Sequence, residues 1–264
     1  MSTIASTYSP AAGAAARPAA ASLAAHKDTQ LLARLTGLFF LITYATSIPP
    51  YVSMYVPALS NPAFVLGGGF DQVVSWGAIL ELVLILANIA SALTLYPVLK
   101  RRFPVLSLGF VTARLTESAF IAIGIVAVLA LNTLRLHGVP TGADEAGLMA
   151  AGQALVAVHD WTFRLGPGVV VGVGNGLILG WMMWKTRLLP RALSILGLIG
   201  GPALLVAGGA VVLGVIEAGA TWQAIATIPE FFWELGLGLW LLVRGFTPSA
   251  VTELERSGSA STAR

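Results

Sequence analysis

Six apolar segments dominate the sequence and limit the folds that it can adopt. A helix rises about 1.5 Å per residue, so about 20 residues cross the roughly 30 Å hydrocarbon core of a bilayer. The fourth and sixth segments are short by this measure, and the others are long enough. The sequence therefore predicts an all-α membrane protein, a bundle of six transmembrane helices. The segments run over residues 31–48, 73–96, 105–131, 168–184, 192–216 and 229–243.

The composition argues against a soluble domain. Only 10% of the 264 residues are charged, and 56% are hydrophobic. A soluble domain carries about 25% charged residues, and a chain this poor in charge cannot cover a surface that faces water. The net charge of +3 comes from basic residues beside the apolar segments, which indicates the lipid bilayer as the partner and no nucleic acid. The absence of cysteine excludes disulfides and thiolate metal sites.

The two ends of the chain differ from its apolar middle. Residues 1–30 are rich in Ala, Ser and Pro, and Arg17-Pro18 interrupts their weakly apolar run. We therefore predict a disordered cytoplasmic tail over 1–30 and no cleaved signal peptide. Residues 31–246 form the predicted six-helix transmembrane domain, and 247–264 form a second predicted disordered cytoplasmic tail.

The distribution of Lys and Arg predicts the orientation of the bundle. If both termini are inside, the cytoplasmic side holds twelve of these residues and the outer side holds only Arg135. The positive-inside rule then places the chain in the cell (inner, cytoplasmic) membrane with both termini in the cytoplasm. The twelve residues are Arg17, Lys27, Arg34, Lys100, Arg101, Arg102, Lys185, Arg187, Arg191, Arg244, Arg256 and Arg264.

Glycines recur every four residues along the fourth apolar segment, at Gly168, Gly172, Gly176 and Gly180. This spacing keeps them on one face of a helix, where small residues let a neighbouring backbone approach closely. No phosphate-loop pattern fits the run, so helix packing is the better interpretation. The preceding Gly166-Pro167-Gly168 is expected to break the chain before the membrane crossing.

Ionisable residues within or beside the apolar segments form a candidate site. A charge at the bilayer centre costs about 2.5–3.5 kcal/mol on insertion scales, so such a residue usually contacts a partner or lines a cavity. Arg114 and Glu117 lie three residues apart, and Asp160 and Arg164 lie four apart in the order that favours a helical ion pair. We predict that the candidates line a ligand-binding cavity in the outer half of the membrane. They are Glu81, Arg114, Glu117, His159, Asp160, Arg164, Glu230 and Glu234.

These candidates include five acids and only two arginines. Full ionisation would leave an excess of negative charge in a medium of low dielectric constant. A bound cation, protonation of an acid, or exposure of Glu230 to water must relieve that excess. A small cationic or proton-coupled ligand is therefore the expected partner.

Three functions stay open on these residues. The first is a binder or transporter of a small molecule or ion. The second is a hydrolase-like intramembrane enzyme that uses His159, Asp160 and the glutamates, although the chain offers few catalytic groups and no G-x-S-x-G motif. The third is a structural or accessory membrane protein whose ion pairs only fix helix register. The sequence favours the first, predicts no catalytic residue, metal site or cofactor, and leaves the ligand and the oligomeric state open.

Several motifs of the chain resemble one family of bacterial integral membrane proteins, domain of unknown function 4386. The motifs are HDWTF before a Gly-rich span, LLPRALSILGLIGG, and PEFFWELGLGLWLLVRGF, together with ARLTGLFFLI near the start and ARLTES around Arg114 and Glu117. The resemblance covers roughly residues 31–246. It implies a six-helix membrane protein and no particular activity.

Overall fold

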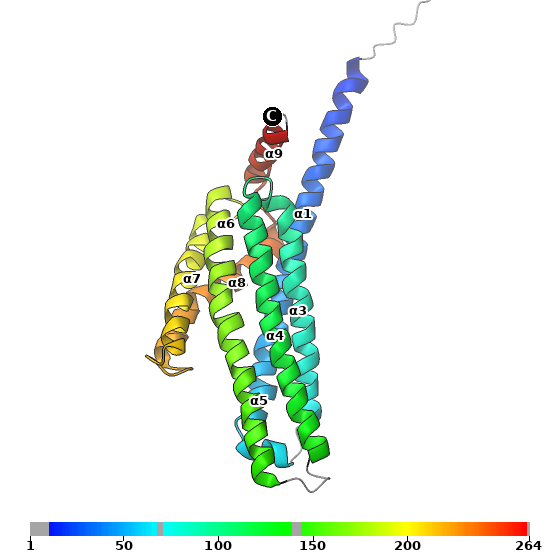
Figure 1. Cartoon of the computed structure of the whole chain (residues 1–264). Coiled ribbons are helices and arrows are strands. Elements are labelled where there is room, and N and C mark those ends of the chain that lie inside the picture. Colours follow the sequence, from blue (N-terminus) through cyan, green and yellow to red (C-terminus); the bar gives the residue numbers. More distant parts are fainter. Residues whose placement is uncertain (1–10, 68–70, 139–143, 263–264) are drawn as a thin grey trace, which may run out of the picture.

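The structure is a computed structural model that describes residues 11–67, 71–138 and 144–262, with side chains described over 26–67, 72–137 and 144–256. Its described elements are all helical (Figure 1). The α-helices are α1 (Ala11–Pro50), α2 (Val56–Leu59), α3 (Asp71–Leu99), α4 (Pro104–Gly138), α5 (Glu145–Leu165), α6 (Gly180–Thr186), α7 (Arg191–Val212), α8 (Thr221–Arg244) and α9 (Pro248–Thr262). The π-helical segments η1 (Tyr51–Tyr55), η4 (Gly166–Val170) and η5 (Gly172–Leu179) and the 3-10 segment η2 (Pro62–Leu66) complete them.

Six of the described helical stretches are long and apolar enough to cross a membrane, which confirms the predicted class and number of spans. Two stretches combine several elements: η1 and α2 continue α1, and η4, η5 and α6 continue α5. The stretches are His26–Leu59, Gln72–Leu99, Pro104–His137, Glu145–Thr186, Arg191–Val212 and Thr221–Arg244.

The fourth span begins earlier than predicted, at Glu145, and Gly166-Pro167-Gly168 does not break it. An α-helical proline loses one hydrogen bond, and its ring clashes with the carbonyl four residues before it. The wider π turn of η4 relieves this clash, so the helix continues through Pro167 with changed geometry. The expectation of a break at this position was wrong.

Two other span boundaries also differ from the sequence pattern. The sixth span starts at Thr221, so Pro229 lies inside α8 instead of in its first turn. The sequence pattern did not show this start, because apolar and polar residues are mixed over residues 221–228 before Pro229. The fifth span ends at Val212, since the chain turns at Gly214, whose φ of 69° disfavours other residues.

Helix occupies parts of both segments that we predicted to be disordered. Helix α1 starts at Ala11, and α9 covers 248–262, with Val251 and Leu254 buried against the bundle. Residues 1–10 and 263–264 lie outside the described part of the chain. The division of the chain into a membrane domain and two cytoplasmic tails stays a prediction.

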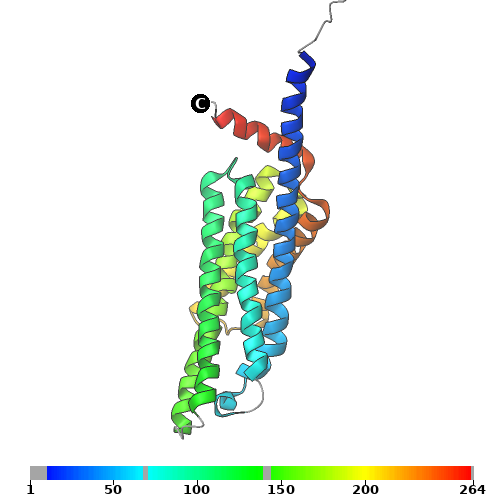
Figure 2. The same cartoon turned by 90° about the vertical axis from the view of Figure 1, so that its right-hand side faces the viewer.

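The spans pack in a closed ring around the bundle axis. Helix α3 packs against α1 and α4, α4 packs against α5 and η5, η5 packs against α7, α7 packs against α8, and α8 returns to α1. Figures 1 and 2 show the long helices side by side, with α1 extending beyond the others at one end. We call this end the basic end, because the α3–α4 connection with Lys100, Arg101 and Arg102 lies there, and the opposite end the far end.

Two large apolar clusters fill the ring at different heights, and a smaller third cluster, Ala78, Leu84, Ile121 and Ile125, lies between them along α3 and α4. The cluster toward the basic end contains Phe40 and Phe110, and the cluster toward the far end contains Tyr55 and Val128. Along α1 and α4, the positions between these residues contribute polar side chains to the interior. The two apolar layers therefore enclose a polar layer between them.

Glycines allow η5 and α7 to cross at close range. A Cβ atom on Gly172 would lie 2.8 Å from the carbonyl oxygen of Gly201 on α7, and one on Gly176 would overlap the Gly201 backbone. A Cβ on Gly180 would touch Gly197 at 3.4 Å. This confirms that three of the four glycines in the predicted pattern, Gly172, Gly176 and Gly180, face another helix, α7.

Candidate functional site

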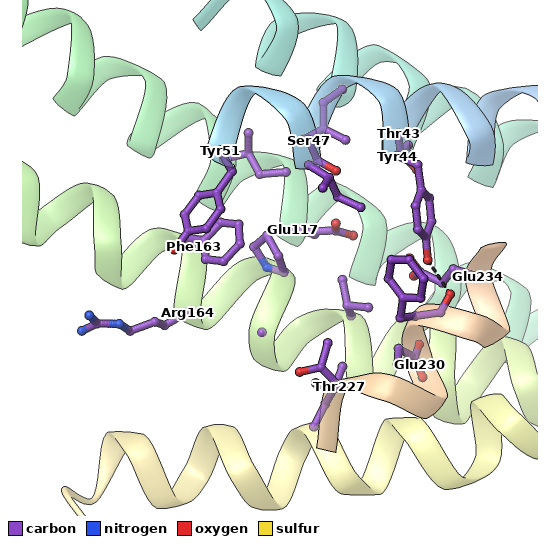
Figure 3. A pocket seen from close by; sticks show the side chains of 18 of the residues that line it. Thr43, Tyr44, Ser47, Tyr51, Glu117, Phe163, Arg164, Thr227, Glu230 and Glu234 are labelled. Atoms are coloured by element: carbon purple, nitrogen blue, oxygen red, sulfur yellow. Dashed lines mark hydrogen bonds between the residues drawn. The ribbon is translucent and has the colours of Figure 1, made fainter. Parts of the chain in front are cut away.

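A cavity of about 480 Å³ lies at the level of the polar layer. Its walls come from α1, α3, α4, α5, η4, α7 and α8, and from the connection between the last two. Figure 3 shows Tyr51, Phe163 and Arg164 toward one end of the cavity, and Tyr44 and Glu234 toward the other. Seven of the eight candidate residues line it, namely Glu81, Arg114, Glu117, Asp160, Arg164, Glu230 and Glu234.

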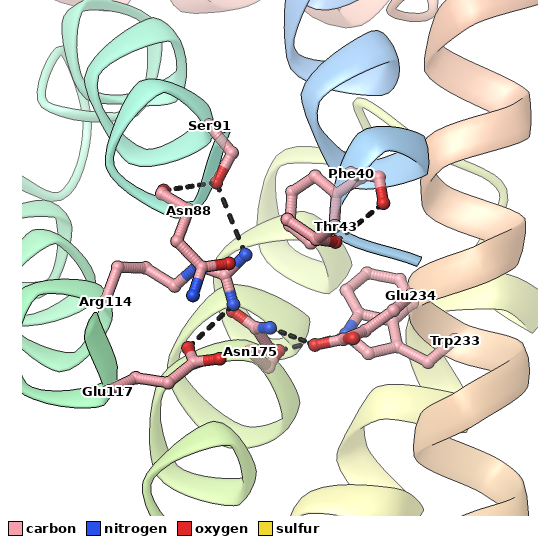
Figure 4. A network of polar contacts seen from close by, with 9 residues as sticks. All are labelled: Phe40, Thr43, Asn88, Ser91, Arg114, Glu117, Asn175, Trp233 and Glu234. Carbon is pink, nitrogen blue, oxygen red and sulfur yellow. Dashed lines mark hydrogen bonds and ion pairs between the residues drawn. The ribbon is translucent and has the colours of Figure 1, made fainter. Parts of the chain in front are cut away.

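Arg114 links three helices at the end of the cavity that lies toward the basic end of the bundle (Figure 4). Its guanidinium donates a 2.8 Å hydrogen bond to the Glu117 carboxylate and a 3.4 Å bond to the Ser91 hydroxyl of α3. It also lies 5.2 Å from the centre of the Phe40 ring of α1, within cation–π range. Arg114 and Glu117 are both buried, so the ion pair predicted from their spacing is present and shielded from water.

Glu234 belongs to a second polar group, formed between α8 and η5. Its carboxylate accepts a hydrogen bond from the side-chain amide of Asn175, and the neighbouring Trp233 donates one of 3.0 Å to the Asn175 carbonyl oxygen. Asn175 and Trp233 are both completely buried. The π-helical backbone of η5 thus presents an amide to α8, and π segments occur often at functional sites.

Glu230 lacks such partners. Only 3% of its surface is exposed, and neither carboxylate oxygen has a hydrogen-bond partner within the described part of the chain. The carboxylate packs where η5 crosses α7, since a Cβ on Gly200 would lie 2.6 Å from Oε2 and one on Gly176 would lie 2.8 Å from it. A buried carboxylate without a donor is costly, so either protonation of Glu230 or a cation in the cavity must offset this cost.

Glu81 contacts the α1 extension. The Tyr55 hydroxyl donates a 2.8 Å hydrogen bond to Glu81 Oε2. The Tyr55 ring also packs edge-on against the His159 imidazole, with 5.1 Å between ring centres. Tyr55 therefore connects the cavity acid of α3 to the histidine of α5.

Asp160 and Arg164 form the predicted ion pair, but in a looser and more exposed form. Their closest atoms are 3.5 Å apart, and 44% of the Asp160 side chain and 30% of the Arg164 side chain are exposed. His159 is buried instead, with its Cδ2 near Gly124 of α4 and its Nδ1 3.8 Å from Asp160. His159 is the one candidate residue that does not line the cavity, and it lies directly behind the cavity residue Asp160.

The contacts leave three cavity acids without a basic partner. Arg114 pairs with Glu117, and Arg164 pairs with Asp160, whereas Glu81, Glu230 and Glu234 form no ion pair in the described residues. Within those residues, no group of three or more His, Asp and Glu side chains is arranged to hold a metal ion. The three acids without a basic partner suit a ligand that carries positive charge.

A family model described as a domain of unknown function, DUF4386, matches residues 35–245. The chain belongs to the DUF4386 family. The match runs from the middle of α1 to the residue after α8 and so includes all or most of each of the six spans, as the resemblance from sequence motifs predicted. No curated protein and no solved structure gives a significant match.

Sequence reasoning missed several residues of the DUF4386 cavity. Asn88 lines the cavity, and Asn175 binds the cavity acid Glu234. Both carried a usable signal, because each is an amide in an apolar span and such groups usually have a buried partner. The aromatic residues of the walls carried no such signal, since Tyr and Phe are common in membrane helices. These residues are Tyr44, Tyr51, Phe163 and Phe231.

Proposed function

We propose that this DUF4386 protein binds a small cationic ligand in the cavity between its two apolar layers. The observation that supports this most directly is Glu230, a buried carboxylate without a hydrogen-bond partner in the cavity wall. Glu81 and Glu234 line the same cavity and have no basic partner among the described residues. A cation would offset the cost of burying these charges, which two arginines offset only in part.

We further propose that the protein lies in the cytoplasmic membrane of a bacterial cell with both termini inside. The basic end carries Lys100, Arg101 and Arg102, as the positive-inside rule expects for a cytoplasmic face. Two residues of the α7–α8 connection, Ala218 and Gly219, line the cavity on the side of the far end. In this orientation the cavity receives its ligand from outside the cell.

Thermal unfolding of the purified protein tests cation binding. Tetramethylammonium at about 100 times its Kd would stabilise the folded state by about 2.7 kcal/mol. For a protein of this size, that raises Tm by roughly 5–10 °C. Glu230→Gln should reduce this rise to about half or less, because binding that is at least about tenfold weaker leaves at most about 1.4 kcal/mol of stabilisation at the same concentration. It should also increase Tm without ligand, because the amide keeps the shape and removes the unpaired charge.

Glu145→Gln is the matched control, because Glu145 is exposed in the first turn of α5, away from the cavity. This variant should respond to tetramethylammonium as the natural protein does. The proposed function is wrong if tetramethylammonium leaves Tm unchanged, or if it stabilises Glu230→Gln as much as Glu145→Gln.

A further inference from the structure

The cavity is larger than a simple cation needs. A volume of about 480 Å³ lies within the range of roughly 300–1,000 Å³ that is typical of sites for small organic molecules. A single inorganic ion would leave most of this volume filled by water or lipid. The size therefore favours a ligand with an organic body beside its charge.

Two aromatic pairs line the cavity. The rings of Tyr51 and Phe163 are stacked, with centres 4.7 Å apart and planes 5° from parallel. The rings of Tyr44 and Phe231 meet edge to face at 5.3 Å, and the Tyr44 hydroxyl donates a 2.6 Å hydrogen bond to the Phe231 carbonyl oxygen. These contacts hold the four rings in defined positions on α1, η1, α5 and α8.

The charges and the aromatic pairs are distributed unevenly along the cavity. Figure 3 shows Glu234 beside Tyr44, whereas Tyr51 and Phe163 lie toward the opposite end near Arg164. Each arginine is paired with an acid, Arg164 with Asp160 at one end and Arg114 with Glu117 at the other. Glu230 and Glu234 have no basic partner, so they leave an excess of negative charge near Tyr44 that favours a cation there. An aromatic face also attracts an ammonium group, so Tyr44 supports the acids there.

Building on the proposed cation binding, we infer that the ligand is an organic ammonium with an apolar body about the size of one aromatic ring. The ammonium group lies near Glu230, Glu234 and Tyr44. The apolar body extends along the cavity toward the stacked pair of Tyr51 and Phe163. Leu84, Ile121 and Val171 supply further apolar surface for this body.

Titration calorimetry of the protein in lipid nanodiscs, with two probes, tests this assignment. Tetramethylammonium carries the charge alone, and benzyltrimethylammonium adds one ring. We expect the benzyl compound to bind about tenfold more tightly, as burial of one ring against aromatic walls implies. Phe163→Leu and Tyr51→Leu should each reduce this preference to about threefold or less, and leave the affinity for tetramethylammonium within about twofold.

Phe232→Leu is the matched control. Phe232 follows the wall residue Phe231 on α8, but it is exposed and does not line the cavity. It should keep the full preference. Phe163→Leu and Tyr51→Leu lie on different elements, so the test still works if one of these variants misfolds. Size-exclusion chromatography would reveal such misfolding.

The outcomes separate this inference from the function on which it rests. If both probes bind the natural protein equally, or if Phe232→Leu loses as much preference as Phe163→Leu, the assignment of the apolar body is wrong and cation binding stands. If neither probe binds at millimolar concentration, the proposed function fails, and this inference fails with it.

Discussion

Removing one partner of the Arg114–Glu117 ion pair should destabilise the protein more than removing both. Each single substitution, Arg114→Leu or Glu117→Leu, leaves an unpaired charge between two apolar layers. The double variant removes the pair and leaves the net charge of the cavity unchanged. Arg114→Leu should be the most damaging of the three, because Arg114 is also the arginine at the acidic end of the cavity.

The structure sets the size of the effect. Two unit charges 2.8 Å apart attract by roughly 6 kcal/mol at an effective dielectric constant of about 20. Desolvation of the two groups offsets much of this attraction, so each single variant should lose about 3–5 kcal/mol and the double variant much less. The expected coupling energy is therefore about 3 kcal/mol or more.

The pair of Asp160 and Arg164 provides a control within the same cavity. Its atoms are 3.5 Å apart, and its side chains are 44% and 30% exposed. An ion pair of this kind contributes about 0–1 kcal/mol. A double-mutant cycle on this pair should accordingly give a small coupling energy.

Both cycles can be measured by reversible unfolding in mixed detergent micelles, followed by the loss of helical circular dichroism. Additive effects of Arg114→Leu and Glu117→Leu, within about 0.5 kcal/mol, would show that the two groups do not interact. Equal coupling in the two cycles would refute the reasoning from burial.

Three further predictions address the fold. Reporter fusions after residue 264 and in the α3–α4 connection should show a cytoplasmic location. A reporter in the α7–α8 connection should show an external one. An external C-terminus would overturn the proposed orientation. Gly176→Leu should strongly reduce the yield of folded protein because its side chain would overlap Gly201, whereas Gly209→Leu, with open space at its Cβ, should not; equal yields would contradict the helix crossing. Tyr55→Phe should cost about 1–3 kcal/mol of unfolding free energy, because Glu81 loses its hydroxyl donor, and no loss would show that this hydrogen bond contributes nothing.

The sequence was sufficient to predict the spans, because their apolar length is a local property of the chain. The glycine crossing was also predictable, since the four-residue spacing places Gly172 and Gly176 on one face of a helix. The helix ends were less predictable. Pro167 and Pro229 usually end or start helices, and here a π turn and a long amphipathic first segment allow helix on both sides of them.

The candidate site was predictable in part. Charged residues in apolar spans can be recognised from the sequence, because placing a charge in the bilayer costs free energy. Seven of the eight chosen residues line one cavity. His159 belongs to the interface with α4 near Gly124, which only the three-dimensional packing of α4 against α5 determines. The aromatic walls depend on contacts between distant segments, such as Tyr51 with Phe163, which the sequence does not mark.

Three ligands of nearly equal shape can show whether the cavity selects for positive charge. Tetramethylammonium, tert-butanol and pivalate are a cation, a neutral molecule and an anion, each built around a compact group of three or four methyls. Titration calorimetry of the natural protein in nanodiscs should detect binding of tetramethylammonium only, weakened at least about tenfold by Glu230→Gln. Equal binding of tert-butanol, or tighter binding of pivalate, would contradict the account.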